Sequence, residues 1–157
     1  MYSSKKLKQM EKQIIIKAFE ENKEEVDQIL KKILSYPFPE GVQSIYFSGE
    51  TFEFGLGFDA RPADESLRPH PLHGEEDFGA AGFDFEKYVE ELIPDKQERQ
   101  VFLWEHLDDF LVAAEDLCAK WLSERFKELG GESFPIPCFI GFEGADDVYH
   151  LQAGKYV

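Results

Sequence analysis

Residues 42–59 read VQSIYFSGETFEFGLGFD and alternate large apolar residues with small or polar ones. This period of two is typical of β-strands, whereas an amphipathic helix repeats its apolar residues every three or four positions. Residues 48–50 interrupt the alternation and predict the turn of a β-hairpin. The second strand is expected to present four apolar side chains on one face: Phe52, Phe54, Leu56 and Phe58. Because an isolated hairpin is marginally stable in water, other parts of the chain must cover this face.

The longest helical pattern covers residues 95–129, with Asp95 as the expected N-cap and Gly130 and Gly131 as the expected stop. Apolar residues recur there at the i, i+3, i+4, i+7 spacing of an amphipathic helix. The expected inward stripe is Leu103, Leu107, Phe110, Leu111, Ala114, Leu117, Cys118, Trp121, Leu122 and Phe126. A shorter helix is predicted over residues 85–93, capped by Asp84.

A second amphipathic pattern covers residues 5–35 and ends before Pro37. Residues 20–25 are wholly polar, so the pattern fits either one bent helix or two helices with a break near Asn22. Near the C-terminus, residues 136–142 alternate as a strand, and residues 148–152 are expected to return as its hairpin partner. The chain of 157 residues is therefore predicted to be a single α+β domain. Its expected sheet is antiparallel, with about four strands in two hairpins, packed against the long helix and the N-terminal helix.

Residues 60–82 lack periodicity, contain three of the eight prolines, and predict a long irregular loop. The formal net charge of the chain is −15, and residues 41–116 carry 19 acidic against 5 basic residues, a net of −14. Such a field repels nucleic acid and anionic lipid and attracts a basic protein. The acidic loop is therefore the expected partner-binding surface, and its candidate residues are Asp59, Asp64, Glu65, Glu75, Glu76 and Asp77.

Three short motifs contain residue types that could carry chemistry. The stretch from Gly55 to Ala60 matches the dinucleotide pattern GxGxxA by letter, but no helical pattern follows it, so no nucleotide site is expected. His70 and His73 lie beside carboxylates, and this composition fits either a divalent metal site or a solvated acidic loop. His106 fits either general acid–base chemistry or an exposed helix face. No catalytic set and no cofactor are predicted.

The compartment is expected to be the cytoplasm. Cys118 and Cys138 are the two cysteines, and both lie in predicted core segments, where reduced thiols are usual. The basic N-terminus is not followed by an apolar run of signal-peptide length, and no stretch has the length of a membrane span.

The order of elements resembles that of small cytoplasmic immunity proteins of bacterial polymorphic toxin systems. The resemblance lies in the N-terminal helix, the aromatic hairpin IYFSGETFEFGLGF, the acidic middle, the long helix and the late segment IPCFIGFEGADD. It implies a non-catalytic protein that blocks a toxin, often a basic nuclease, through an acidic surface.

Three functions remain open on these observations. The first is an acidic binding protein that sequesters a basic protein partner, in the manner of toxin immunity. The second is a small-ligand or metal-dependent enzyme that uses residues 59–77. The third is a structural or regulatory domain.

Overall fold

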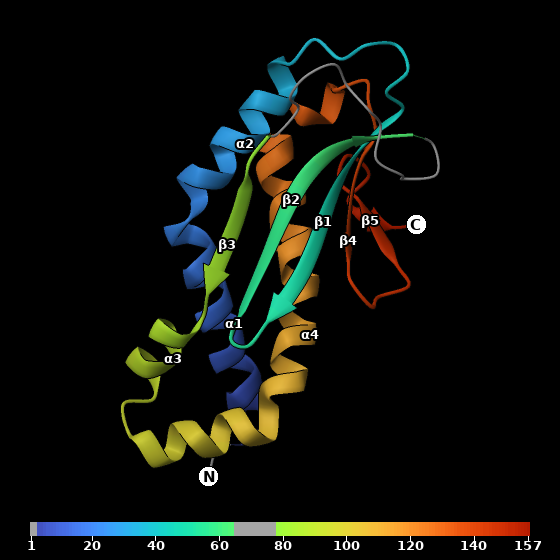
Figure 1. The fold of residues 1–157 in the computed structure, drawn as a ribbon. Coiled ribbons are helices and arrows are strands. Elements are labelled where there is room, and N and C mark those ends of the chain that lie inside the picture. Colours follow the sequence, from blue (N-terminus) through green and yellow to red (C-terminus); the bar gives the residue numbers. More distant parts are fainter. Residues whose placement is uncertain (1–2, 65–77) are drawn as a thin grey trace.

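The computed structural model describes residues 3–64 and 78–157. A single sheet and a set of helices make up the described part (Figure 1). The helices are α1 (Ser4–Glu21), α2 (Lys23–Ser35), α3 (Glu86–Leu92), α4 (Lys96–Glu128) and the 3-10 turn η1 (Gly131–Ser133). The strands are β1 (Ser44–Phe52), β2 (Gly55–Ala63), β3 (Ala80–Asp84), β4 (Cys138–Phe142), β5 (Val148–His150) and β6 (Lys155–Tyr156).

The six strands form one sheet in the order β3-β2-β1-β4-β5-β6. β1 and β4 run parallel, and all other neighbouring strands run antiparallel. Parallel neighbours need a crossover connection, and here β2, β3, α3 and α4 lie between β1 and β4 in the chain. The predicted α+β class is confirmed. The expected antiparallel sheet of about four strands is wrong in strand number and in the direction of its central pair.

The first hairpin turns later than the sequence pattern indicates. β1 continues to Phe52 and pairs with β2 through a two-residue turn at Glu53 and Phe54, not at residues 48–50. Leu56 and Phe58 therefore face the core, but Phe52 lies on the opposite face with 49% of its surface exposed. The Phe52 ring fills the space beside Gly55, where a Cβ atom would come within 2.3 Å of it. The predicted four-residue apolar face is thus wrong.

The expected loop at residues 60–82 contains strand at both ends. β2 extends to Ala63, and β3 pairs with β2 from Ala80 onward. The middle of the predicted loop lies outside the described residues. The Gly55–Ala60 stretch is the first part of β2, and the strand continues past it without a helix, as expected.

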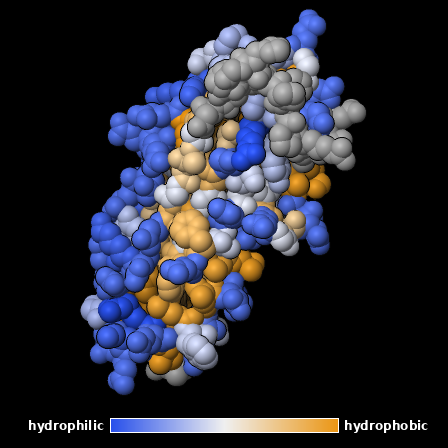
Figure 2. All heavy atoms as spheres, viewed as in Figure 1, coloured by the Kyte–Doolittle hydropathy of each residue, from blue (hydrophilic) through white to orange (hydrophobic). Residues whose placement is uncertain are grey.

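The helices cover one face of the sheet and leave the other open. Ile45 and Phe47 point from β1 into the core, whereas Tyr46 and Ser48 alternate with them on the open face. In Figure 1, α1, α2 and most of α4 lie behind the strands, whereas the first turns of α4 run across the bottom of the view before the helix bends upward. Figure 2 shows apolar and weakly polar residues along the middle of the open face, bordered by the hydrophilic outer sides of α1 and α2.

The N-terminal pattern forms two helices rather than one bent helix. The chain breaks at Asn22, whose side-chain amide donates to the Ala18 carbonyl at 2.8 Å. The long helix α4 is confirmed nearly to the residue, and Asp95 is its N-cap, accepting from the backbone N–H of Glu98 at 2.9 Å. Among the described residues, no helix combines the length and apolarity that a membrane crossing requires.

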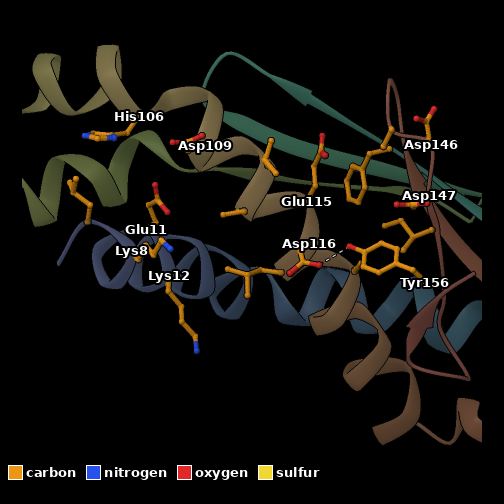
Figure 3. A pocket seen from close by; sticks show the side chains of 18 of the residues that line it. Lys8, Glu11, Lys12, His106, Asp109, Glu115, Asp116, Asp146, Asp147 and Tyr156 are labelled. Carbon is orange, nitrogen blue, oxygen red and sulfur yellow. Dashed lines mark hydrogen bonds between the residues drawn. The ribbon is translucent and has the colours of Figure 1, made fainter. Parts of the chain in front are cut away.

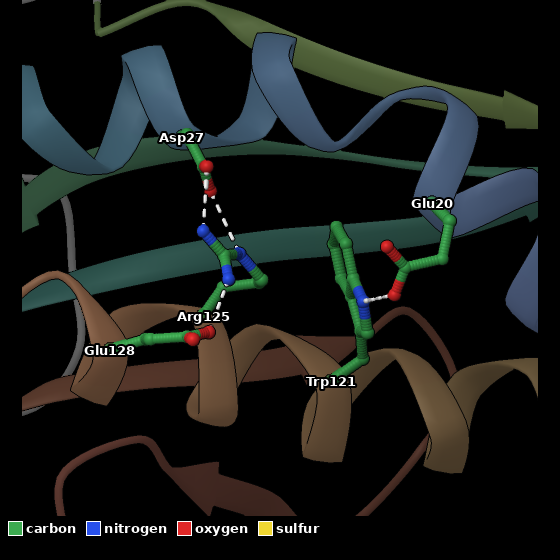
Figure 4. Close-up of polar contacts among 5 residues, drawn as sticks. All are labelled: Glu20, Asp27, Trp121, Arg125 and Glu128. Carbon is green, nitrogen blue, oxygen red and sulfur yellow. Dashed lines mark hydrogen bonds and ion pairs between the residues drawn. The ribbon is translucent and has the colours of Figure 1, made fainter.

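Two polar contacts join α4 to the N-terminal helices inside the structure (Figure 4). Arg125 is only 8% exposed, and its guanidinium donates to both carboxylate oxygens of Asp27, with Nε–Oδ1 at 2.9 Å and Nη2–Oδ2 at 2.6 Å. It also contacts Glu128. One turn earlier, the Trp121 Nε1–H donates to Glu20 at 3.3 Å. The paired charge lets an arginine occupy a helix face that is otherwise apolar.

Candidate functional site

An open groove with a volume of about 840 Å³ lies between α1, α4 and the turn that connects β4 to β5 (Figure 3). Its floor is apolar and includes Ile140 and Phe142 of β4. Its walls carry six carboxylates: Glu11, Asp109, Glu115, Asp116, Asp146 and Asp147. The basic side chains on the same walls are Lys8, Lys12 and, when protonated, His106. We call this feature the acidic groove.

Helical spacing brings the α4 carboxylates to one side of the groove. Asp109 and Asp116 are seven residues apart and therefore lie on the same face, two turns from each other. Glu11 faces them from α1, and Asp146 and Asp147 close the far end from the β4–β5 turn (Figure 3). The groove thus gathers acidic residues from three segments that are distant in sequence.

Two of these carboxylates are ionised at an energetic cost. Burial raises the pKa of Glu11, and the neighbouring charge of Asp109 raises it further, while His106 and Lys8 partly offset the effect. Burial also raises the pKa of Glu115. A cation placed between these groups would stabilise their charged forms, because opposite charges within a few ångströms favour ionisation.

Asp116 is held differently. Its Oδ1 accepts from the Tyr156 hydroxyl at 2.7 Å, and its Oδ2 accepts from the Lys120 ammonium at 2.8 Å. Although burial acts to raise the pKa of Asp116, the hydrogen bonds from Lys120 and Tyr156 lower it overall. Asp116 therefore keeps its charge and also fixes β6 against α4.

We predict that Glu115→Gln raises the melting temperature at pH 7. An acid whose pKa is raised by folding loses stability as the pH rises from its usual value of 4.5 through the raised one. The amide removes this loss, so the gain should disappear when the pH falls below 4.5, where wild-type Glu115 is also protonated. Thermal unfolding, monitored by circular dichroism from pH 7 to below pH 4.5, measures the difference in melting temperature between the variant and the wild type.

Glu53→Gln on the exposed hairpin turn is the matched control for removing one negative charge. Equal gains in the two variants would assign the effect to net charge instead of to the burial of Glu115.

The two described members of the sequence-predicted binding set, Asp59 and Asp64, do not line this groove. Asp59 lies on the open face of the sheet, where it pairs with Arg61 at 2.8 Å. Asp64 follows β2, and its carbonyl accepts from the Ser44 hydroxyl at 2.9 Å. The other four candidates, Glu65, Glu75, Glu76 and Asp77, lie outside the described residues. So do His70 and His73, the candidate metal ligands.

His106 and the two cysteines are the remaining residues that the sequence singled out. His106 lines the acidic groove, with its Nε2 3.8 Å from Glu105. Within residues 3–64 and 78–157, no group of three or more potential ligands has the geometry to hold a metal ion. Cys118 and Cys138 are both buried and unpaired, and burial raises the pKa of each thiol. Neither thiol is therefore poised as a nucleophile.

Sequence reasoning missed the groove because its members come from separate segments. Glu11 belongs to an N-terminal region that carries a net charge near zero, and Asp146 and Asp147 were interpreted only as turn residues. The seven-residue spacing of Asp109 and Asp116 was the available signal, since it places both on one face of a segment with a regular helical pattern. Compared with protein-family models, with curated proteins and with solved structures, the chain gives no match.

Proposed function

We propose that this protein is a non-catalytic binding protein that takes a basic segment of a partner protein into the acidic groove. The observation that carries the proposal is that six carboxylates and two lysines line one open groove, and of the six Asp116 is already paired with Lys120. Because Glu11 and Glu115 have raised pKa values, ionised groove carboxylates are under-stabilised until a cation arrives. Lysine and arginine side chains of a partner supply that cation.

The spread of the charges favours an extended segment over a single metal ion. Glu11 and Asp109 lie at one end of the groove, and Asp146 and Asp147 lie at the other (Figure 3). An ion coordinated by protein oxygens needs several ligands within a few ångströms of one point. Successive basic side chains of an extended chain match charges placed along a groove.

The experiment uses a short peptide of alternating Lys and Ser, labelled at one end, with binding followed by fluorescence anisotropy. We expect binding that weakens as the salt concentration rises from about 50 to about 200 mM, because salt screens exposed charges. The triple variant Glu11→Gln, Asp109→Asn, Glu115→Gln should bind the peptide about tenfold more weakly.

The matched control removes three exposed carboxylates elsewhere: Glu50→Gln, Glu53→Gln and Glu90→Gln. If the control weakens binding as much as the groove variant does, net charge and not the groove attracts the peptide, and the proposal fails.

Toxin immunity is the specific form of the proposal. It requires a toxin-like gene beside this one, whose product is neutralised on co-expression, and the absence of such a neighbour would remove that form.

A further inference from the structure

The first half of α4 carries an exposed apolar stripe. Trp104 is 91% exposed, and Val101 and Val112 on the same helix are 43% and 66% exposed. By contrast, Trp121, the only other tryptophan in the chain, is buried. Leu103 and Leu111 are partly buried and pack against the core, so they hold the helix in place while the indole points outward. We call Val101, Trp104 and Val112 the Trp104 stripe.

Trp104 lies beside another exposed apolar residue, Val101, one turn earlier on α4. Single exposed apolar residues are common, but contiguous ones mark interaction surfaces, and tryptophan is enriched among residues that dominate binding energy. The partners of the indole in this structure do not explain its position, because almost all of its surface meets solvent. Covering it with apolar atoms is favourable in proportion to the area removed from water.

The charges around the stripe indicate the kind of partner that covers it. Glu105 follows Trp104 directly, and Asp108 lies one turn further along the same face. The other neighbours on this face, Gln97 and Gln100, are uncharged. A second copy of this chain would bring another net charge of −15 to the surface, so electrostatics disfavours self-association. The surface is complementary to an apolar segment bordered by basic residues.

The stripe and the acidic groove share one residue. Val112 belongs to the stripe and also lines the groove. One partner segment can therefore contact both surfaces along α4. This shared residue ties the stripe to the function proposed above, on which the inference rests.

We propose that Trp104 anchors an amphipathic basic segment of the partner protein. Apolar side chains of that segment cover the Trp104 stripe, and its Lys and Arg side chains pair with Glu105, Asp108 and the carboxylates of the acidic groove.

Two labelled peptides of about 14 residues, long enough for one amphipathic helix, test this inference. The first combines Lys with Leu at helical spacing, and the second replaces every Leu by Ser while keeping the Lys residues. The Lys–Leu peptide should bind more tightly than the Lys–Ser peptide. It should also shift tryptophan emission to shorter wavelength and protect Trp104 from acrylamide quenching, because Trp104 is the exposed indole of the two.

Trp104→Ala should weaken binding of the Lys–Leu peptide at least about tenfold. Its affinity for the Lys–Ser peptide should stay within about twofold of the wild-type value. Because Trp104 makes little contact with the core, circular dichroism should show an unchanged fold. Phe52→Ala, which removes a half-exposed ring from the open sheet face, is the control and should leave both affinities unchanged.

The outcomes separate the two proposals. If the Lys–Ser peptide binds in the groove and Trp104→Ala has no effect on the Lys–Leu peptide, the inference fails while the proposed function stands. If neither peptide binds, both fail. Protection of Trp104 that grows with protein concentration in the absence of peptide would assign the stripe to a second copy and overturn the inference.

Discussion

Replacing Arg125 with alanine is expected to lower the free energy of unfolding by about 3–5 kcal/mol, the usual cost of breaking a largely buried ion pair from one side. Arg125 is 8% exposed and makes two hydrogen bonds to Asp27 across the α2–α4 interface (Figure 4). Without the guanidinium, the Asp27 carboxylate stays in a poorly solvated position with no cation beside it. Urea denaturation of the variant and the wild type measures the difference.

Lys120→Ala is the matched control because it breaks an ion pair on the same helix. The Lys120–Asp116 pair is 2.8 Å long, but both side chains are well exposed, so its loss should cost only about 0–1 kcal/mol. A double variant, Arg125→Met with Asp27→Leu, should recover most of the stability, since replacing both charges leaves no unpaired group. Equal losses in Arg125→Ala and Lys120→Ala would mean that the Asp27 contact contributes no more than a surface pair.

Local signals in the sequence predicted the helices well. Predicting the two ends of α4 requires only a capping residue at the start, a period of 3.6 and a glycine pair at the end. All of these signals lie in or directly beside the segment. Asp95 acts as the predicted cap, and Gly130 takes the left-handed φ of +93° that ends such a helix. The register of the first hairpin was harder to predict, because Gly49 resembles a turn residue but lies inside β1.

The sheet was under-predicted because its extra strands carry weak local patterns. β3 reads AAGFD, which contains one large apolar residue facing the core, Phe83, and so lacks a clear alternation. β6 has only two residues. The parallel pairing of β1 with β4 joins segments about a hundred residues apart, and periodicity within either strand carries no information about it.

The candidate binding surfaces show the same difference between what local sequence patterns reveal and what depends on long-range packing. The sequence showed an excess of acidic residues within residues 41–116. The acidic groove is also lined by Glu11, Asp146 and Asp147, which lie outside that range. Arg125 shows the converse case, because an arginine in a helical pattern is normally placed on the solvent side. Only the packing of α2 against α4 reveals that Asp27 pairs with it.

The buried polar contacts and Trp104 lie at opposite ends of α4. Trp121 and Arg125, toward the C-terminal end, hold the helix against α1 and α2, whereas Trp104, toward the N-terminal end, is almost fully exposed. The acidic groove borders the middle of the helix, from His106 to Ala119. Trp104→Ala should therefore change affinity with little effect on stability, and Arg125→Ala should do the reverse.

Phe19→Ala is expected to be the most destabilising single replacement in the aromatic core, at about 3–5 kcal/mol. Phe19 is fully buried on α1, and its ring centre lies 4.8 Å from that of Phe83 on β3 and 5.2 Å from that of Trp121 on α4. Its ring also faces Phe85 at 6.4 Å. Removing it leaves a cavity at the junction of the sheet and two helices, and rigid neighbours on three sides limit any collapse into that space.

Phe52→Ala makes the same chemical change at a half-exposed site, where solvent can fill the space, so a loss of about 1 kcal/mol is expected. Chemical denaturation of both variants compares a buried with an exposed phenylalanine in one protein. The buried Trp121 offers an independent signal, because loss of the adjoining ring should shift its emission toward longer wavelength in Phe19→Ala alone. Similar losses in the two variants would mean that Phe19 is not the packing centre that links α1 to β3 and α4.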